Sequence, residues 1–212
     1  MDLKKTLKGK CYIPLCFAVM AAALLFCYFV PKELIDYSKL INIETGLDRS
    51  IPFIPQWIIV YFLAFLFWAV NGIIIVIGDK NNAVRFTCAF LMSMIVSAVC
   101  FVVFPATLTR PEIAGDGFFA QWMRFMYNAD SPVCLCPSMH VLISYMCWRG
   151  VFRSGNVSRG YRAFNFIFFV LVCFSVVFVK QHVLADIPAG IAVAEICLQT
   201  ADHIKPERFF RR

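Results

Sequence analysis

The feature that most restricts the fold of this chain is a series of six long apolar runs, at residues 12–30, 54–78, 86–108, 137–152, 163–180 and 183–200. A helix needs about 20 apolar residues to cross the hydrocarbon core of a bilayer. With 61% hydrophobic and only 16% charged residues, the chain is also too apolar for an ordinary soluble domain. We therefore predict an all-α, polytopic membrane protein in which residues 1–212 form one membrane-embedded domain with six transmembrane helices.

The fourth and sixth runs are the least typical of membrane spans. The fourth is short, and the sixth contains Asp186 and Glu195. Ionisable residues inside a span are rare, and they face the interior of a bundle or take part in function. Four and five spans are therefore the alternatives to six. For Glu195 we expect a hydrogen bond between helices or a position near the inner interface.

Positive charges are distributed unevenly between the two ends of the predicted spans. With six spans, the segments on the N-terminal side hold 14 of the 20 Lys and Arg residues, beginning with Lys4, Lys5, Lys8 and Lys10. Cytoplasmic loops carry such an excess, so both termini are predicted to be cytoplasmic. This asymmetry also explains the net charge of +7. Because no single basic face is present, we predict no nucleic-acid partner.

Two long loops are predicted on the external side, at 31–52 and 109–136. Within the second, residues 117–127 combine aromatic side chains with a single charge, which predicts a short helix at the membrane interface. Three polar stretches also fall on this side, at 110–111, 137–140 and 180–186. The spans follow from apolarity alone, so the arrival of all three stretches at one face independently indicates a functional site.

The stretch Pro137-Ser138-Met139-His140 has the features of an anion site. Proline at the first helical position leaves backbone N–H groups free, and the start of a helix carries partial positive charge. Ser138 adds a hydroxyl donor. Histidine has an ordinary pKa of about 6.5, so His140 can give or take a proton at neutral pH. We predict that this turn captures a phosphate and that His140 supplies a proton.

His182 and Asp186 are four residues apart, which predicts that they share one face of a helix. The carboxylate can then accept from one ring nitrogen and leave the other unprotonated. A neutral imidazole held in this way can attack phosphorus and form a phosphohistidine. Arg110 is predicted to stabilise the equatorial oxygens of the phosphoryl group, and Lys180 to assist.

Plainer interpretations exist for the same residues. Arg110 and Lys180 also lie near predicted helix ends, where the only role of a long cationic side chain can be to bring its charge to the membrane interface. His140, His182 and Asp186 are of the types that bind a metal ion, but no carboxylate cluster supports such a site, so we expect no metal. Two of the chain's three histidines, His140 and His182, lie at the motif spacing, and this favours a functional role over a structural one.

These residues resemble the three motifs of the type 2 phosphatidic acid phosphatase superfamily, written K-x6-R-P, P-S-x-x-H and S-R-x5-H-x3-D. The resemblance implies a six-helix membrane fold over nearly the whole chain, with His182 as nucleophile. It further implies that Asp186 orients His182 and that His140 protonates the leaving group. In this sequence the matching residues are Arg110 and Pro111; Pro137, Ser138 and His140, in the shorter form P-S-x-H; and Ser175, His182 and Asp186.

Two positions depart from the motifs. Val103 stands at the lysine of the first motif and Val176 at the arginine of the third. Lys180 is the only obvious local replacement for these cations. Residues 48–55 are similar to the segment that begins the second span in inositol phosphorylceramide synthases. Together these features favour the phosphotransferase-like branch that contains those synthases.

From His140, His182 and Asp186, our leading prediction is metal-independent hydrolysis of a lipid phosphate or lipid diphosphate, without a cofactor, through a phosphohistidine intermediate. The site is expected at the extracytoplasmic face of a bacterial cell membrane. One alternative is a lipid phosphotransferase that moves a phosphorylated head group to an acceptor lipid alcohol. Another is a non-catalytic protein that binds or transports a lipid phosphate through the same anion site.

Overall fold

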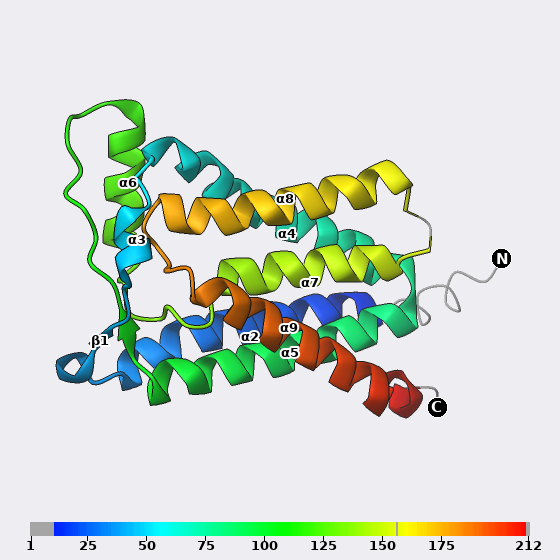
Figure 1. Ribbon diagram of the computed structural model, residues 1–212. Coiled ribbons are helices and arrows are strands. Elements are labelled where there is room, and N and C mark those ends of the chain that lie inside the picture. The colour runs from blue at the N-terminus through cyan, green and yellow to red at the C-terminus, as the bar shows by residue number, and fades with distance from the viewer. Residues whose placement is uncertain (1–10, 156, 211–212) are drawn as a thin grey trace.

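A bundle of six long helices dominates the computed structural model, which describes residues 11–155 and 157–210 (Figure 1). The predicted all-α class is confirmed, and each apolar run coincides with one long helix. The long helices are α2 (Tyr12–Leu34), α4 (Ile58–Gly78), α5 (Lys80–Val103), α7 (Met139–Arg153), α8 (Arg159–Phe178) and α9 (Asp186–Ile204). The shorter elements are α3 (Gly46–Ser50), α6 (Phe118–Ala129), the strands β1 (Ile41–Asn42) and β2 (Ala106–Thr107), and 3-10 turns at Tyr37–Lys39, Pro55–Trp57 and Pro206–Phe210.

Helix α5 covers residues 80–103, whereas the apolar run predicted for it covers 86–108. The side chain of Asp79 accepts a hydrogen bond of 2.8 Å from the backbone N–H of Asn82 and so caps the helix. This cap lets the polar residues that follow Asp79 join the helix. At the other end Pro105 stops the helix, because the residue before a proline disfavours the helical conformation.

In the part of the chain that the structure describes, four helical segments are long and apolar enough to cross a membrane. They are Tyr12–Leu34, Pro55–Gly78, Lys80–Val103 and Arg159–Phe178. Helix α7 has 15 residues and is about 22 Å long, shorter than the bilayer core of about 30 Å. Helix α9 is longer but carries charged residues. The four apolar segments are compatible with an integral membrane protein.

Helix α7 is packed inside the bundle, against α4, α8 and α9. Residues 140–144 are consecutive in sequence and all of them are buried. Consecutive helical residues point in different directions around the axis, so such a run requires neighbours on every side. Burial on every side explains why the first turn of this short helix, with His140, lies in the protein interior.

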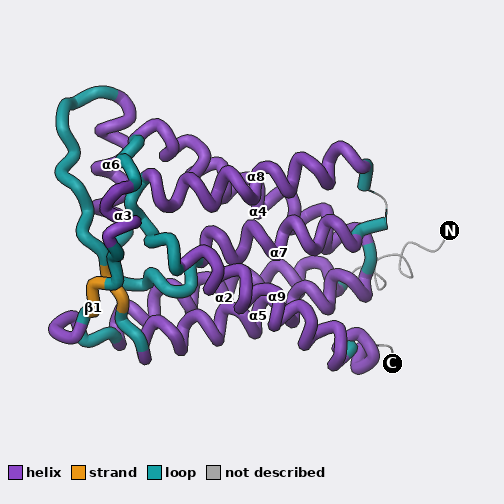
Figure 2. Tube along the Cα trace, in the orientation of Figure 1, coloured by secondary structure: helices purple, strands orange, loops and turns teal. Residues whose placement is uncertain are grey.

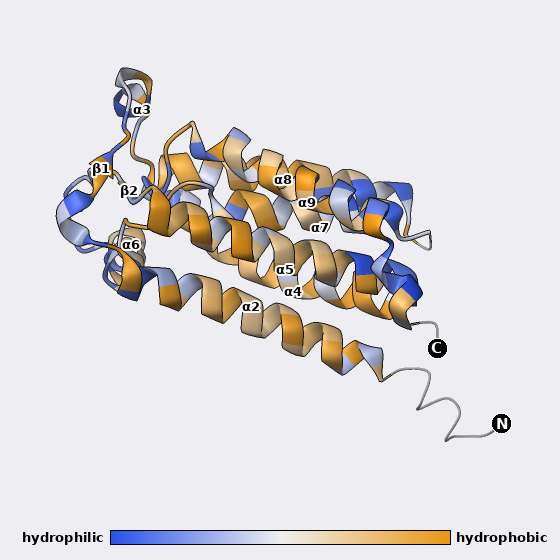
Figure 3. Cartoon of the chain, turned by 90° about the horizontal axis from the view of Figure 1, so that it is seen from below, coloured by the Kyte–Doolittle hydropathy of each residue, from blue (hydrophilic) through white to orange (hydrophobic). Residues whose placement is uncertain are grey.

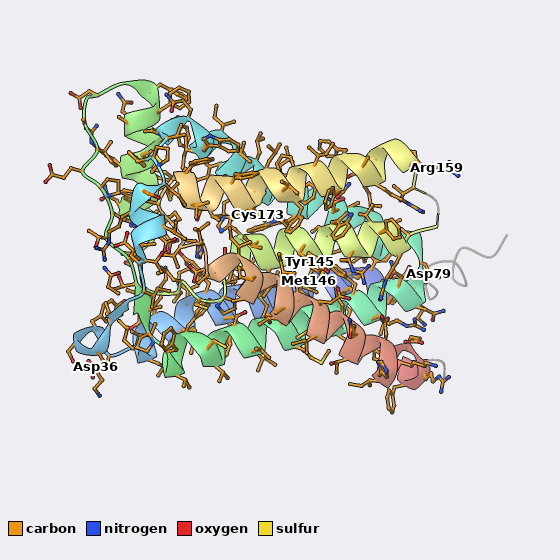
Figure 4. The ribbon with its side chains drawn as sticks, in the orientation of Figure 1. Asp36, Asp79, Tyr145, Met146, Arg159 and Cys173 are labelled. Atoms are coloured by element: carbon orange, nitrogen blue, oxygen red, sulfur yellow. The ribbon has the colours of Figure 1, made fainter. Side chains whose placement is uncertain are left out.

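Consecutive long helices run in opposite directions, so the start of α2 and the end of α9 lie at the same end of the bundle (Figure 1). Helices α3 and α6 and strand β1 gather at the other end with the longer loops, and we call this the loop end (Figure 2). Apolar residues follow the length of the helices (Figure 3). Among the labelled side chains, Asp36 lies at the loop end, whereas Asp79 and Arg159 lie at the opposite end (Figure 4).

The two long loops of the loop end are joined by a short parallel β pair. Ile41 in β1 pairs with Ala106 in β2, and Asn42 pairs with Thr107. The helix predicted at 117–127 is confirmed as α6. Its Met123 is fully buried. Because the opposite face of α6 is exposed and aromatic, this helix has the amphipathic pattern expected of an interfacial element.

Glu195 joins two helices, as expected from its position inside an apolar run. The Tyr145 hydroxyl donates a hydrogen bond of 2.8 Å to its carboxylate, and Arg149 donates two bonds of 2.9 and 3.0 Å. Arginine fits a carboxylate with two parallel hydrogen bonds, which makes this pairing strong. The carboxylate on α9 is therefore satisfied by α7, and it takes no part in the site described below.

Gly190 permits a close approach of α9 to the start of α7. A Cβ atom at this position would lie 2.9 Å from the Ser138 carbonyl oxygen and 3.3 Å from the Leu142 nitrogen. We expect Gly190→Ala to destabilise the protein by about 1–3 kcal/mol, because backbone atoms cannot move aside as a flexible side chain can. Thermal unfolding in detergent measures this change. The matched control is Gly160→Ala in α8, where nothing lies within 4 Å of the new methyl group. Equal melting temperatures for the two variants would contradict this prediction.

Candidate active site

His182 and Asp186 are in direct contact at the loop end of the bundle. Nδ1 of His182 lies 3.0 Å from Oδ2 of Asp186, and the backbone N–H of Val183 donates to the same oxygen at 3.1 Å. Asp186 is completely buried and His182 is 9% exposed. A carboxylate accepts but cannot donate, so Nδ1 carries the proton and Nε2 keeps its lone pair. The pairing predicted from the sequence is present.

The prediction that both residues lie on a helix is wrong. Helix α9 begins at Asp186, and His182 lies in the turn that connects α8 to α9. The backbone N–H groups of Gln181 and His182 each donate to the Val176 carbonyl at 3.0 Å, which ends α8 and reverses the chain. The Asp186 side chain then reaches back over this turn. The contact survives because a turn of this length brings the two side chains as close as one helical turn does.

His140 lies in the first turn of α7, and aromatic rings of α4 fix the orientation of its ring. Its imidazole stacks on Tyr61, with ring centroids 4.0 Å apart and planes inclined by 25°. The rings of Phe65 and Trp68 lie 5.3 and 5.0 Å away. In the part of the chain that the structure describes, Nε2 of His140 has no hydrogen-bond partner. A buried polar atom without a partner at this position is suited to exchange a proton with a bound molecule.

Ser138 is the N-cap of α7, and the prediction that Pro137 opens the helix is wrong by two positions, because α7 begins at Met139. The Ser138 hydroxyl accepts from the Val141 N–H at 3.4 Å, and its backbone N–H donates to the Asp186 carbonyl at 3.3 Å. Serine is among the residues preferred at an N-cap, since its oxygen replaces a missing helical acceptor. Ser138 thus ties the turn that holds His140 to the start of α9.

Arg110 approaches this site through Gln181. Its guanidinium donates to the Gln181 side-chain oxygen and, at 3.0 Å, to the Tyr127 carbonyl. The same group lies 4.3 Å from the centre of the Tyr127 ring, an arrangement that stabilises a cation. In the described structure, Arg110 Nε is buried without a partner. Gln181 is the neighbour of His182 in the chain and lines the same cavity, so Arg110 lies directly behind one of the cavity-lining side chains.

Lys180 is directed away from the histidines. Its Nζ donates a hydrogen bond of 2.6 Å to the backbone carbonyl of Asp48. The Asp48 carboxylate accepts from the Leu184 N–H at 2.7 Å and from Thr45. Burial raises the pKa of Asp48, but these hydrogen bonds outweigh burial and hold the pKa below its usual range. Lys180 and Asp48 together brace the turn that carries His182.

Three further motif positions belong to the scaffold. Val103 is 77% exposed at the end of α5, and Val176 is fully buried in the core of α8. The Ser175 hydroxyl donates to the Val172 carbonyl of its own helix at 2.8 Å. None of the three lines the cavity described next. Val176 packs in the same core cluster as Tyr61 and Val141, and its carbonyl accepts from the His182 N–H, so it supports the site by packing and supplies no charge.

A cavity of about 350 Å³ connects the two histidines to the bundle surface. His140, Gln181 and His182 line it together with Asp130, and most of the remaining wall is apolar. Several lining side chains from α2 and α4 are also exposed on the outside of the bundle, which places an opening between these helices: Leu25, Phe29 and Phe65. An apolar cavity with a few convergent polar groups has the character of a small-molecule or lipid site.

Sequence reasoning missed four residues that shape this site. Tyr61 carries the His140 ring, Gln181 links Arg110 to the cavity, Asp48 braces the His182 turn, and Asp130 adds a carboxylate to the cavity wall. Gln181 could have been identified from the sequence, because it adjoins His182. Tyr61 and Asp48 come from segments far away in sequence, and only their packing brings them to the site, whereas Asp130 lies in the loop before α7, where no spacing marked it.

Comparison of this chain with known protein families, with curated proteins and with solved structures gives no match. The residues that the structure describes contain no group of three His, Cys, Asp or Glu side chains that could hold a metal ion. A function for this protein is therefore inferred from the geometry of the site and from the motif resemblance.

Proposed function

We propose that this protein is a membrane lipid phosphatase that hydrolyses a lipid phosphate or lipid diphosphate through a phosphohistidine intermediate. The observation that carries this proposal is the placement of two histidines in one apolar cavity, where Asp186 pairs with Nδ1 of His182 at 3.0 Å. The match of these residues to the motifs of type 2 phosphatidic acid phosphatases supports the same reaction. The apolar wall suits a substrate that carries lipid chains.

The direction of the helices supports six membrane crossings with both termini in the cytoplasm. Lys80 begins α5, Arg153 ends α7 and Arg159 begins α8, and all three lie at the end opposite the site. An excess of such cations marks the cytoplasmic side, so the loop end and its cavity face outward in this proposal. Six further cations that support this orientation lie outside the described residues: Lys4, Lys5, Lys8, Lys10, Arg211 and Arg212.

The proposed reaction has two displacements at phosphorus. In the first, Nε2 of His182 forms a bond to phosphorus while the bond to the lipid oxygen breaks, and His140 gives its proton to that oxygen. Asp186 stabilises the positive charge that develops on the His182 ring. In the second, water gives a proton to His140 and attacks phosphorus, which releases inorganic phosphate and restores His182.

In this proposal the start of α7 holds the phosphoryl oxygens, and Arg110 supports them electrostatically. The N–H groups in the first turn of a helix have no acceptor within the helix and favour an anion. Arg110 does not line the cavity, but its guanidinium holds Gln181, which does, so its positive charge acts on the phosphate from behind that side chain. Both groups would stabilise charge on the three equatorial oxygens as the bond to the leaving group breaks.

The test is incubation of the purified protein with phosphatidate, phosphatidylglycerol phosphate and polyprenyl diphosphate, with inorganic phosphate as the readout. Release of free phosphate from at least one of them is the expected result. Transfer of the phosphorylated group to an added lipid alcohol, without free phosphate, would instead identify a phosphotransferase. Binding of these lipids with neither product would identify a lipid-phosphate binding or transport protein.

Chelation is expected to leave phosphate release unchanged. The proposed chemistry uses only protein groups, so treatment with EDTA should keep the rate of the untreated enzyme on the same lipid. The measurement is phosphate release before and after chelation, with a known metal-dependent phosphatase as the positive control. Loss of activity that an added divalent cation restores would contradict the proposed mechanism.

A further inference from the structure

Asp130 brings a carboxylate into the wall of the cavity that holds the two histidines. The residue directly follows α6, and its backbone N–H donates to the Met126 carbonyl at 3.0 Å. Its side chain reaches α2, where the Tyr28 hydroxyl and Lys32 Nζ donate hydrogen bonds of 2.7 and 2.8 Å. Lys32 Nζ also lies 3.7 Å from the centre of the Tyr28 ring. Two helices that are far apart in sequence thus fix this carboxylate.

The two oxygens of Asp130 have different surroundings. Oδ1 accepts both hydrogen bonds from α2, whereas Oδ2 accepts none from the residues that the structure describes. The side chain is 30% exposed. Burial raises the pKa of Asp130, but the bonds from Lys32 and Tyr28 outweigh burial and keep the pKa below its usual range. The group is therefore ionised at neutral pH, with one oxygen available to a molecule in the cavity.

An ionised carboxylate can accept hydrogen bonds but cannot donate one. Among the described residues that line the cavity, Asp130 is the only acidic one. An ester carbonyl or a second phosphate on the lipid also only accepts hydrogen bonds, so neither is a favourable partner for Asp130. A hydroxyl or an ammonium group can donate to it, and a hydrogen bond to a charged acceptor is stronger than one between neutral groups.

We propose that Oδ2 of Asp130 binds a hydrogen-bond donor, a hydroxyl or an ammonium group, on the lipid beside the phosphate, and so determines substrate specificity. This inference rests on the proposed phosphatase function and names its substrate class. Lipid phosphates with a free hydroxyl or amine near the phosphate are preferred. Fully acylated phosphatidate and polyprenyl diphosphate, which lack such a donor, are poorer substrates.

The sharpest probe is a pair of lipids that differ in one hydroxyl: lysophosphatidate and its 2-deoxy analogue. We expect wild-type kcat/KM to favour lysophosphatidate by about 10- to 100-fold, the range for a hydrogen bond to a charged group. The difference should appear mainly in KM, because the hydroxyl does not react. An analogue with a 2-amino group in place of the hydroxyl tests whether an ammonium group also serves as the donor. We expect wild-type kcat/KM to favour this analogue over the 2-deoxy lipid as well.

Asp130→Ala should bring the ratio of the two kcat/KM values close to one, and Asp130→Asn should give an intermediate ratio. In the Asn variant, Tyr28 and Lys32 still donate to the amide oxygen, so the NH₂ group replaces Oδ2. The matched control is Ser131→Ala, which removes a hydroxyl from the same cavity wall, leaves Asp130 with both of its donors and should keep the preference. A purely structural role of Asp130 would slow both substrates equally and leave their ratio unchanged.

Binding separates this inference from the phosphatase proposal. Trp68 lines the cavity, so quenching of tryptophan fluorescence in the His182→Ala background, with and without Asp130→Ala, measures the dissociation constants of both lipids without turnover. A binding preference that depends on Asp130, without phosphate release by the wild-type protein, would support the role of Asp130 and overturn the phosphatase. Phosphate release at equal kcat/KM for both lipids, or a preference that persists in Asp130→Ala, would overturn the role of Asp130 alone.

Discussion

His182→Ala is expected to abolish phosphate release from every lipid that the wild-type protein hydrolyses. Alanine has no lone pair with which to attack phosphorus, so the first displacement cannot occur on the protein. Removal of a catalytic nucleophile lowers kcat by many orders of magnitude, so we expect a loss of about 10⁶-fold. The measurement is phosphate release at saturating lipid. A second readout is the acid-labile phosphoenzyme, which should form in the wild type and be absent from this variant.

The matched control for this prediction is His203→Ala. His203 is exposed near the end of α9, where its Nδ1 lies 2.9 Å from the Gln199 carbonyl. It lies at the end of the bundle opposite the cavity, so this variant should keep the wild-type rate. Comparable activity of His182→Ala and the wild type would show that another group attacks phosphorus.

Asp186→Asn should lower kcat by about 10⁴-fold, the loss seen when an amide replaces the carboxylate partner of a catalytic histidine. A neutral amide cannot stabilise the positive charge that forms on the His182 ring, and it can also hold the ring in the wrong tautomer. KM should change little, because Asp186 does not line the cavity. The measurement is kcat and KM for the best lipid of the panel.

The control for Asp186→Asn is Asp202→Asn, another carboxylate of α9 at the opposite end of the bundle. Asp202 pairs with Arg153 at the helix surface. Surface ion pairs contribute at most about 1 kcal/mol, so this variant should fold and retain full activity. If Asp186→Asn kept a tenth or more of the wild-type kcat, Asp186 would have only a structural role.

The helical class and the order of the six long helices could be predicted from the sequence, because they depend on local patterns. An apolar run of bilayer length predicts a helix wherever it occurs, and the structure has a helix at each of the six runs. The contact between His182 and Asp186 was also predictable from their spacing. Even so, the start of α9 was misplaced, because the backbone bonds to the Val176 carbonyl that end α8 leave no trace in apolarity or spacing.

The partners of the cations could not be predicted from the sequence. Lys180 is close to His182 in the chain and Arg110 belongs to a separate motif, and both were expected to act on the phosphate. In the structure Lys180 instead bonds to Asp48, and Arg110 reaches the cavity only through Gln181. A long flexible side chain bonds to whichever acceptor packing brings near, and the α3 segment that holds Asp48 comes from a distant part of the chain.

The sequence by itself therefore determined the apolar helices, their order and the residue types of the candidate chemistry, since each follows from composition or short spacing. Tertiary structure alone decided what surrounds those residues. It stacks His140 on Tyr61, opens the cavity between α2 and α4, and brings Asp130 to its wall. The physical reason is that these contacts join segments far apart in the chain, and their formation depends on how whole helices pack together.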